Sequence, residues 1–321
     1  MGESGTVVSA PSSMSTPSQH DAPPPLVILN PAGARGRAKQ LRALIERSIA
    51  GGRADLALTA GPRDGERLAR EAALAGRDVV AVGGDGTVAE VANGILASGR
   101  DVALGIVPAG TGNDYAYQTL RLPKEPLAAL EAALTAPAVA MDVGQVNERY
   151  FLNSLGVGID ANIAAAAEHL KKLPLMRGQT LYWTASLTEL FFHYNRCPEL
   201  TVEPYGEPVV SRVFALAAVS IGPTYGGGFR INPDADPHDG FFDLCMIWKP
   251  SQLRAFRLLP LIEKGKHLNE PEVKRMRVQR VTMLAKQPIH AHLDGEVISA
   301  DRFDARILPG RLRVRQPATG G

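Results

Sequence analysis

The sequence predicts an α/β protein of two domains, a parallel α/β layer followed by a mainly antiparallel β domain. Three apolar segments, 26–29, 79–82 and 102–107, are each followed by a glycine-containing loop and a helical pattern, which is typical of a parallel sheet covered by helices. After about Gly144 the pattern changes to β-rich stretches. With 321 residues the chain is also longer than one core usually supports, which favours two domains.

Along the chain, the first 25 residues predict a disordered tail, because they hold six Ser and five Pro but few apolar side chains. They contain no apolar stretch preceded by basic residues, so we do not expect a secretion signal. A helix is expected where Leu41, Leu44, Ile45 and Ile49 recur at helical spacing. In the second domain we expect one amphipathic helix over about 180–192 and strands at about 150–155, 200–202, 209–219 and 241–248.

Composition excludes several classes of protein. Lys and Arg number 35 against 33 Asp and Glu, so the net charge of +2 is far from that of a nucleic-acid-binding protein. No run of 18 apolar residues is present, which argues against a membrane-spanning helix. Cys197 and Cys245 lie far apart and match no zinc or disulfide pattern, so we expect a reducing, cytoplasmic location.

The most informative segment is 79–90, in which an apolar strand runs into Gly83 and Gly84. Their missing side chains let backbone N–H groups approach a phosphate, and Thr87 with Glu90 predicts a capping box at the start of the next helix. A carboxylate beside phosphates needs a cation between them, so Asp85 indicates Mg²⁺. A tight turn alone would explain the glycines but not the acid.

Two further loops follow apolar strands. In the segment 107–114, Gly110 and Gly112 free the backbone while Thr111, Asn113 and Asp114 place a hydroxyl, an amide and a carboxylate close together. The loop 29–36 is weak evidence by itself. No Gly-x4-Gly-Lys-Ser/Thr pattern occurs, which excludes a Walker-type phosphate loop.

Together these loops resemble the diacylglycerol kinase catalytic family, which includes the sphingosine and ceramide kinases. Residues 83–87 read as the family's GGDGT signature, shared with NAD kinases and phosphofructokinases, and 108–114 read as the PxGTxND loop of the lipid kinases. The segment 151–161 and Asp294-Gly-Glu296 match two later motifs of the family. The resemblance runs from about residue 26 to about residue 315.

The resemblance implies an NAD-kinase/phosphofructokinase-like nucleotide-binding domain over 26–143, to which the segment 303–315 returns, and a β-sandwich lipid-binding domain over 144–302. It implies ATP and Mg²⁺ as cofactors, with Asp85 holding the Mg²⁺ of the nucleotide. The residues expected around ATP are Asn30, Pro31, Ala32, Gly33, Ala34, Thr59, Gly83, Gly84, Asp85, Gly86, Thr87, Val88, Ala89, Glu90 and Thr111.

The family also implies a second, structural metal between the domains. Its ligands would be the carboxylate of Asp239 and the backbone carbonyls of Asp236 and Phe241. The alternative for this segment is an acidic Pro/Gly turn.

For the reaction, phosphoryl transfer needs a group that takes the proton from the attacking hydroxyl. The DGE motif predicts Glu296 as the proton acceptor, with Asp294 as its rival, and the alternative is a plain Asp-Gly hairpin turn. Asp160 matches a position that contacts the lipid head group in relatives with aminoalcohol substrates; the alternative is an ordinary acid at a helix start. His290 and His292 are expected to be packing or rim residues.

Between residues 253 and 286 there are nine Lys or Arg against three Glu. Such a surplus suits transient contact with an anionic membrane surface, and the alternative is a solvated face of mixed charge. We expect Lys274, Arg275, Arg277 and Arg280 in particular to attract anionic lipid, because they are too closely spaced to be neutralised by the neighbouring Glu270 and Glu272. We expect no nucleic-acid partner and leave a homodimer open.

The function expected from these observations is an ATP- and Mg²⁺-dependent kinase that phosphorylates a lipid hydroxyl, with diacylglycerol as the first candidate. Sphingoid bases, ceramide and phosphatidylglycerol remain open. The rivals are an NAD kinase, which shares GGDGT, and a nucleotide-binding regulator without turnover.

Overall fold

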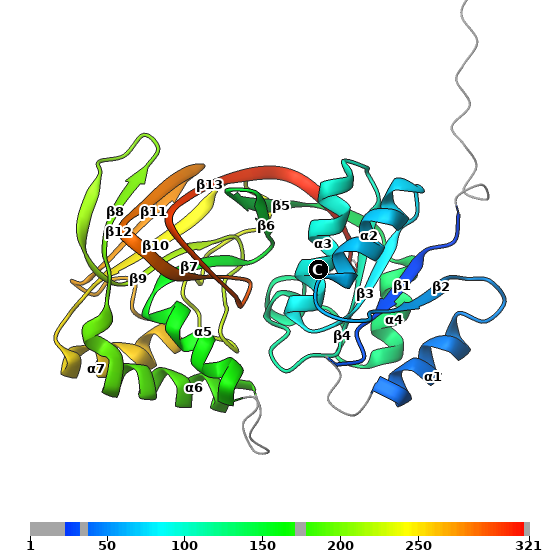
Figure 1. Ribbon diagram of the computed structural model, residues 1–321, viewed down its shortest axis with the longest axis horizontal. Helices are drawn as coiled ribbons and strands as arrows, with labels where there is room; N and C mark the ends of the chain where they lie inside the picture. Colours follow the sequence, from blue (N-terminus) through cyan, green and yellow to red (C-terminus); the bar gives the residue numbers. More distant parts are fainter. Residues whose placement is uncertain (1–22, 33–37, 171–177, 318–321) are drawn as a thin grey trace, which may run out of the picture.

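The computed structural model describes residues 23–32, 38–170 and 178–317 and shows two lobes (Figure 1). The predicted tail, residues 1–25, falls almost wholly outside the described residues. Pro24 and Pro25 already belong to the fold, since their carbonyl oxygens accept hydrogen bonds from the Arg77 side chain and from the Asp55 backbone N–H.

The N-terminal lobe has a four-stranded parallel core with the strand order β2–β1–β3–β4. Side chains that alternate along the strands cover both faces: Ile28 packs toward α2 and α3, and Val27 and Leu29 pack toward α1 and α4. The elements are β1 Leu26–Leu29, α1 Ala38–Ser48, β2 Asp55–Leu58, α2 Asp64–Leu74, β3 Val79–Gly83, α3 Asp85–Ser98, β4 Ala103–Pro108, a π-helical turn η1 Tyr115–Thr119, and α4 Pro126–Thr135.

The second lobe is a mainly antiparallel β structure with helices on one side (Figure 1). Phe214, Phe242 and Met283 belong to its β core, whereas Leu216 and Ile247 belong to the cluster under the helices. Its elements are β5 Ala138–Val146, β6 Arg149–Phe151, β7 Ser154–Gly158, α5 Ile159–Leu170, α6 Gly178–Thr188, the turns η2 Glu189–His193 and η3 Tyr194–Arg196, β8 Glu199–Pro204, β9 Val210–Ser220, β10 Phe242–Trp248, α7 Gln252–Glu263, β11 Val273–Val278 and β12 Arg280–Leu293.

Two strands that pair with each other, β5 and β13, run between the lobes, and the longer one is β13, Glu296–Arg315. It pairs antiparallel with β12 and β5, and its last residues, Arg313 and Val314, pair parallel with β4. The Arg315 guanidinium lies 2.6 Å from the Asp78 carboxylate. The end of the chain therefore completes the sheet of the N-terminal lobe.

The predicted fold class is confirmed, but the prediction of a single helix in the second domain is wrong. Among the residues that the structure describes, three helices, α5, α6 and α7, cover one side of the β structure. The sequence hid α5 because its middle is the run Ala164–Ala167, which makes no stripe of large apolar side chains, and it hid α7 because Pro260 interrupts the pattern. No helix in the described ranges is long and apolar enough to cross a membrane.

Candidate active site

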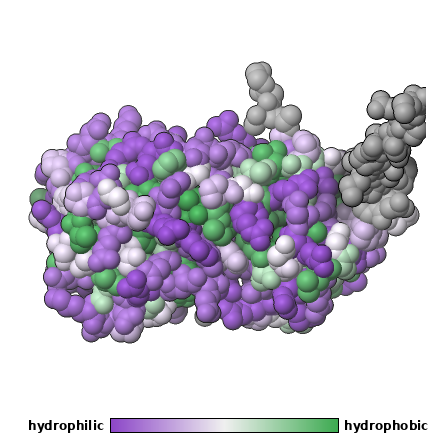
Figure 2. All heavy atoms as spheres, turned by 90° about the horizontal axis from the view of Figure 1, so that it is seen from above, coloured by the Kyte–Doolittle hydropathy of each residue, from purple (hydrophilic) through white to green (hydrophobic). Residues whose placement is uncertain are grey.

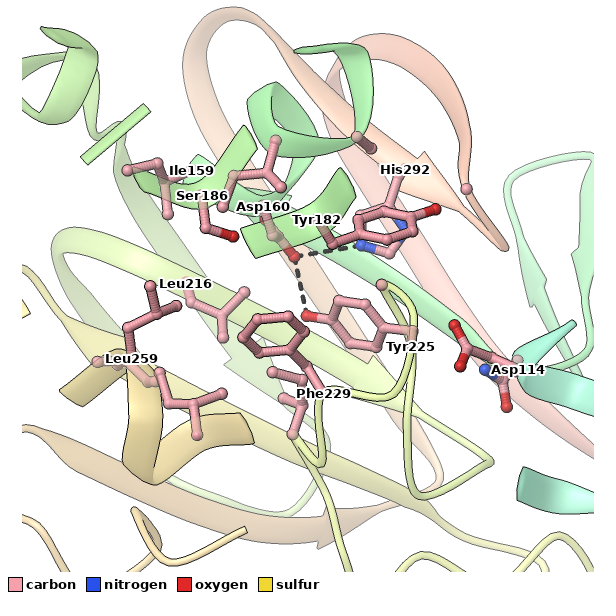
Figure 3. Close-up of a pocket in the computed structure, with 18 of the residues that line it drawn as sticks. Asp114, Ile159, Asp160, Tyr182, Ser186, Leu216, Tyr225, Phe229, Leu259 and His292 are labelled. Carbon is pink, nitrogen blue, oxygen red and sulfur yellow. Dashed lines mark hydrogen bonds and ion pairs between the residues drawn. The ribbon is translucent and has the colours of Figure 1, made fainter. Parts of the chain in front are cut away.

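A cavity of about 140 Å³ begins at the glycine loops of the N-terminal lobe and runs under α5, α6 and α7 of the second lobe (Figure 3). Asp85, Asp114 and Asp294 line its polar end, and Leu216 and Leu259 are among the side chains that line its apolar part. Asp160 adds a fourth carboxylate, while no Lys or Arg of the described chain contributes to the lining. The cavity can therefore hold an apolar molecule with its polar end turned toward the glycine loops.

Two glycine loops touch at the mouth of this cavity. The Ala109 backbone N–H donates to the Gly83 carbonyl at 2.7 Å, and a Cβ added at Gly110 would lie 2.4 Å from the Gly84 Cα. No other residue type fits at Gly110 without moving the backbone. The Asp85 Oδ2 atom accepts the Asn113 backbone N–H at 2.7 Å, which joins the loops a second time.

At the polar end, the Asp85 carboxylate repels those of Asp114 and Asp294. Burial, assisted by the charge of Asp85, raises the pKa of Asp114 to about 7 and that of Asp294 to about 6. Burial also raises the pKa of Asp85 itself. None of the three lies within ion-pair distance of a Lys or Arg in the described residues. This end of the cavity therefore favours the binding of a cation.

Mg²⁺ fits this set of hard oxygen donors, and glycine backbone on both sides leaves room for phosphate. The described chain has no group of three or more His, Cys, Asp or Glu side chains close enough to hold a metal by themselves. The remaining ligands of a cation at Asp85 would therefore have to come from a bound molecule or from water, as is usual for Mg²⁺ with a nucleotide.

Most of the residues expected around ATP lie at the carboxyl ends of β1, β2 and β3. Asn30 donates from its side chain to Thr87 Oγ1 at 3.0 Å and accepts the Ala32 N–H, while the Thr59 N–H donates to the Leu29 carbonyl. Pro31 and Ala32 form an exposed turn, and Thr111 is partly exposed in the second glycine loop. Gly86 lies in the first turn of α3, and Val88 and Ala89 line the cavity. Gly33 and Ala34 lie outside the described residues.

The predicted capping box is wrong. The helix α3 begins at Asp85, with Gly84 as N-cap, so Thr87 and Glu90 are both inside the helix. The Glu90 carboxylate instead accepts the backbone N–H groups of Arg63 and Gly65, at 3.0 and 3.2 Å. Glu90 therefore anchors the start of α2, where Arg63 adopts a left-handed backbone conformation with φ +63°.

The DGE motif forms the two-residue hairpin turn between β12 and β13, with positive φ at Asp294 and Gly295. It is more than a turn, because the Asp294 carboxylate reaches the cavity and accepts the backbone N–H groups of Leu152, Asn153 and Ser154 at 2.7 to 2.9 Å. Glu296 lies outside the cavity lining. Its side chain is 49% exposed, and its carboxylate is 3.5 Å from the Arg149 guanidinium.

Asp160, at the second position of α5, faces the cavity together with two side chains that the sequence did not single out for a site (Figure 3). The Tyr225 hydroxyl donates to Asp160 Oδ2 at 3.0 Å, and His292 Nε2 lies 3.3 Å from the same oxygen. His292 is thus a buried cavity residue. Gly156 makes room for the group, because a Cβ there would lie 2.0 Å from Asp160 Oδ2.

The acidic turn 236–241 is held by ion pairs and backbone bonds. The Asp239 carboxylate pairs with the Arg277 guanidinium and accepts the Phe241 N–H at 2.9 Å, and Asp236 accepts the His238 N–H at 3.0 Å. The donor types suit a hard cation, but Arg277 already occupies one oxygen of Asp239. This turn can hold a metal only if Arg277 gives up that oxygen.

The sequence also missed two buried polar anchors. Asp142, in the middle of β5, accepts the backbone N–H groups of Gly240 and Gly310 at 2.7 and 2.8 Å. Asn153 accepts from the Thr119 hydroxyl and donates to the Thr224 carbonyl. The sequence signals that could have indicated these anchors are an acid, Asp142, inside an apolar strand and an asparagine, Asn153, just before a glycine-rich strand.

The basic cluster Lys274, Arg275, Arg277 and Arg280 is partly neutralised, which the sequence did not anticipate. Arg275 pairs with Asp234 and lies 3.7 Å from Asp243, and Arg277 pairs with Asp239. Glu270 and Glu272 instead pair with Arg254. The charges that neutralise the cluster come from Asp234, from Asp239 in the acidic turn and from Asp243 in β10, which are distant in sequence.

Two family models match the chain. Residues 24–146 match the diacylglycerol kinase catalytic domain, and residues 153–316 match the YegS C-terminal NAD kinase beta sandwich-like domain. The diacylglycerol kinase of Bacillus subtilis is 32% identical over 235 residues, which are 73% of this chain and 76% of the relative. A Pseudomonas fluorescens protein named "Probable lipid kinase YegS-like" is 34% identical over 302 residues, 91% of this chain and 95% of the relative. A crystal structure of a diacylglycerol kinase from Bacillus anthracis superposes with a TM-score of 0.69 at 19% identity, over 92% of this chain and 97% of that one.

Proposed function

The chain belongs to the diacylglycerol kinase catalytic family and is a lipid kinase, and from this premise we propose that it transfers the γ-phosphoryl group of ATP to the free hydroxyl of diacylglycerol, with Mg²⁺. The observation that carries the proposal is the cavity that joins the carboxylates at the glycine loops to an apolar interior. The product would be phosphatidic acid.

The glycine loops would bind the nucleotide. Backbone N–H groups around Gly84 and Gly110 would approach the phosphates, and Asn30 with Thr87 forms the neighbouring polar wall. Asp85 and Asp114 would hold the Mg²⁺ that neutralises the transferred phosphoryl group. These residues would position the phosphates and stabilise the charge of the transferred group, which are the main contributions of a protein to phosphoryl transfer.

The proton of the attacking hydroxyl would pass to the turn 294–296. We assign the acceptor to Glu296, because the oxygens of Asp294 are already engaged by three backbone N–H groups. Glu296 lies outside the cavity, so this assignment requires the lobes to approach each other during turnover. Asp294, which lines the cavity, is the rival acceptor.

The charges of the cavity favour an uncharged acceptor lipid. Four carboxylates and no Lys or Arg among the described lining residues disfavour an anionic lipid such as phosphatidylglycerol. The Asp160 carboxylate already accepts from the Tyr225 hydroxyl and the Ala161 N–H, so it does not require the ammonium group of a sphingoid base. Diacylglycerol meets both conditions.

The test is phosphorylation by labelled ATP of diacylglycerol, sphingosine, ceramide and phosphatidylglycerol in vesicles, with NAD as a further acceptor and Asp85→Asn as the inactive control. We expect diacylglycerol to be labelled fastest and phosphatidylglycerol slowest. Faster labelling of sphingosine or phosphatidylglycerol would overturn the substrate assignment, and labelling of NAD alone would overturn the lipid kinase.

A further inference from the structure

An exposed cluster of apolar side chains lies where η2 meets α7. Phe191 and Phe192 are 67% and 73% exposed, and Leu253 is 64% exposed. The ring centroid of Phe191 lies 5.3 Å from that of Phe192 and 6.0 Å from that of Phe256. With Leu187, one helical turn before Phe191, these five residues form what we call the aromatic patch. Soluble monomers seldom leave such groups of aromatic side chains in water without a partner.

The patch and the acceptor cavity share one wall. Leu190 of η2 and Tyr194, the first residue of η3, are buried and line the cavity, while Phe191 and Phe192 between them face outward. In the same way α7 turns Leu258 into the cavity and leaves Leu253 in solvent. A single turn of helix therefore separates the apolar interior of the cavity from the apolar surface of the patch.

This arrangement is fixed by hydrogen bonds and flanked by positive charge. The Gln252 side chain donates to the carbonyl oxygens of Leu190 and Phe191 at 2.7 and 3.2 Å, which ties η2 to the start of α7. Arg196 and Arg257 are exposed, and neither has an ion-pair partner among the described residues. The acid of this turn, Glu189, is buried and lies 2.9 Å from His193.

We propose that the aromatic patch docks the protein on the surface of a bilayer containing anionic lipid, so that the acceptor lipid enters the cavity from the membrane. The proposal rests on the proposed lipid kinase function. Apolar side chains enter the boundary between head groups and acyl chains, and Arg196 and Arg257 meet the anionic head groups. The face of the molecule away from α5, α6 and α7 is mostly hydrophilic, with scattered apolar residues (Figure 2).

The experiment compares Phe191→Gln/Phe192→Gln with a matched control, Tyr205→Gln/Val209→Gln. The control residues are 74% and 59% exposed and lie at the turn between β8 and β9, away from the helices (Figure 1). Flotation measures binding to phosphatidylcholine vesicles with and without phosphatidylglycerol. Light scattering measures the oligomeric state, and phosphorylation of a short-chain, water-soluble diacylglycerol measures turnover without a membrane.

We expect the patch variant to bind vesicles at least about tenfold more weakly than the wild type, because two phenyl rings no longer leave water. The control variant should bind like the wild type, and both should phosphorylate the soluble substrate at the wild-type rate. Equal vesicle binding by all three proteins would overturn the proposal, as would a patch variant that only dissociates a dimer. A wild type that binds vesicles through the patch but phosphorylates no lipid would instead contradict the proposed function.

Discussion

The Asp85 carboxylate accepts a hydrogen bond of 2.7 Å from the backbone N–H of Asn113. The first residue of α3 is thereby bound to the loop after β4, where Asn113 has a left-handed φ of +57°. Because the second carboxylate of the site, Asp114, follows directly, this bond fixes the spacing of two like charges at the mouth of the cavity. Their repulsion is a cost to the fold that a cation would relieve.

Asp85→Asn should abolish kinase activity and leave the fold intact. The asparagine retains an oxygen that accepts the Asn113 N–H, but it removes the charge that we assign to Mg²⁺. Turnover at saturating Mg²⁺ and the unfolding temperature are the measurements. Near-normal kcat in this variant would contradict the role of Asp85, and a large loss of stability would show that its charge is structural.

Glu296→Gln should lower kcat/KM by about 10²- to 10⁴-fold, because general-base help is lost. Its unfolding temperature should hardly change, since a half-exposed ion pair at 3.5 Å contributes at most about 1 kcal/mol. Asp294→Asn should in contrast destabilise the protein by about 1–3 kcal/mol, because one amide oxygen cannot replace a carboxylate that accepts three backbone N–H groups.

The pH profile separates the two candidate bases. If Asp294 accepts the proton, kcat/KM of the wild type should rise with pH through about 6, the raised pKa of that carboxyl, and Glu296→Gln should keep this limb. If Glu296→Gln lowers kcat/KM only slightly and leaves its rise with pH unchanged, Asp294 is the proton acceptor.

The acidic turn offers a test of the structural metal. Asp239→Ala should lower both stability and activity and should abolish any rise of the unfolding temperature with Mg²⁺, because the carboxylate ligand is gone. Arg277→Gln is the matched variant, because it removes the ion pair but keeps the Asp239 carboxylate. In this variant Mg²⁺ should raise the unfolding temperature more than it does in the wild type. If neither substitution changes the response to Mg²⁺, Asp239 and Arg277 form only a surface ion pair.

The sequence predicted the fold class and the strands near the glycine loops because apolar runs, glycines and family motifs are local signals. Leu26–Leu29 is a strand as expected. Contacts between distant segments could not be read in this way. The Asp160 carboxylate meets Tyr225 and His292 from two other elements, and Arg275 and Arg277 find their acids in the turn 234–239 and in β10.

Local patterns also failed where two interpretations share the same residues. Thr87 and Glu90 have the spacing of a capping box, but the helix begins at Asp85, and Glu90 serves α2 instead. Phe191 and Phe192, whose side chains are exposed, end the segment 180–192, which the sequence predicted only as an amphipathic helix. Only the packing of η2 against α7 shows which of its apolar residues stay in solvent.

The stability of the fold should depend on pH through Asp114. Burial, followed by the charge of Asp85, raises the pKa of this carboxyl from 3.8 to about 7. Between these two values the folded protein binds a proton that the unfolded chain has released, so the free energy of unfolding falls as the pH rises from about 4 to 7. The full shift corresponds to roughly 4 kcal/mol, and this contribution is lost as the pH rises through about 7.

Asp114→Asn removes this titration and keeps an oxygen that can accept the Gly227 N–H, the 2.7 Å bond of the native side chain. The variant should therefore unfold at a higher temperature than the wild type at pH 8 and should differ little from it at pH 4. The pKa values of Asp85 and Asp294 are raised as well, so some pH dependence should remain in the variant.

Added Mg²⁺ should stabilise the wild type more than the variant at pH 8, because a bound cation favours the ionised carboxylates. Chemical denaturation across this range measures both effects, and parallel pH profiles for the two proteins would show that Asp114 is already ionised in the fold and that the repulsion at the mouth of the cavity is weak.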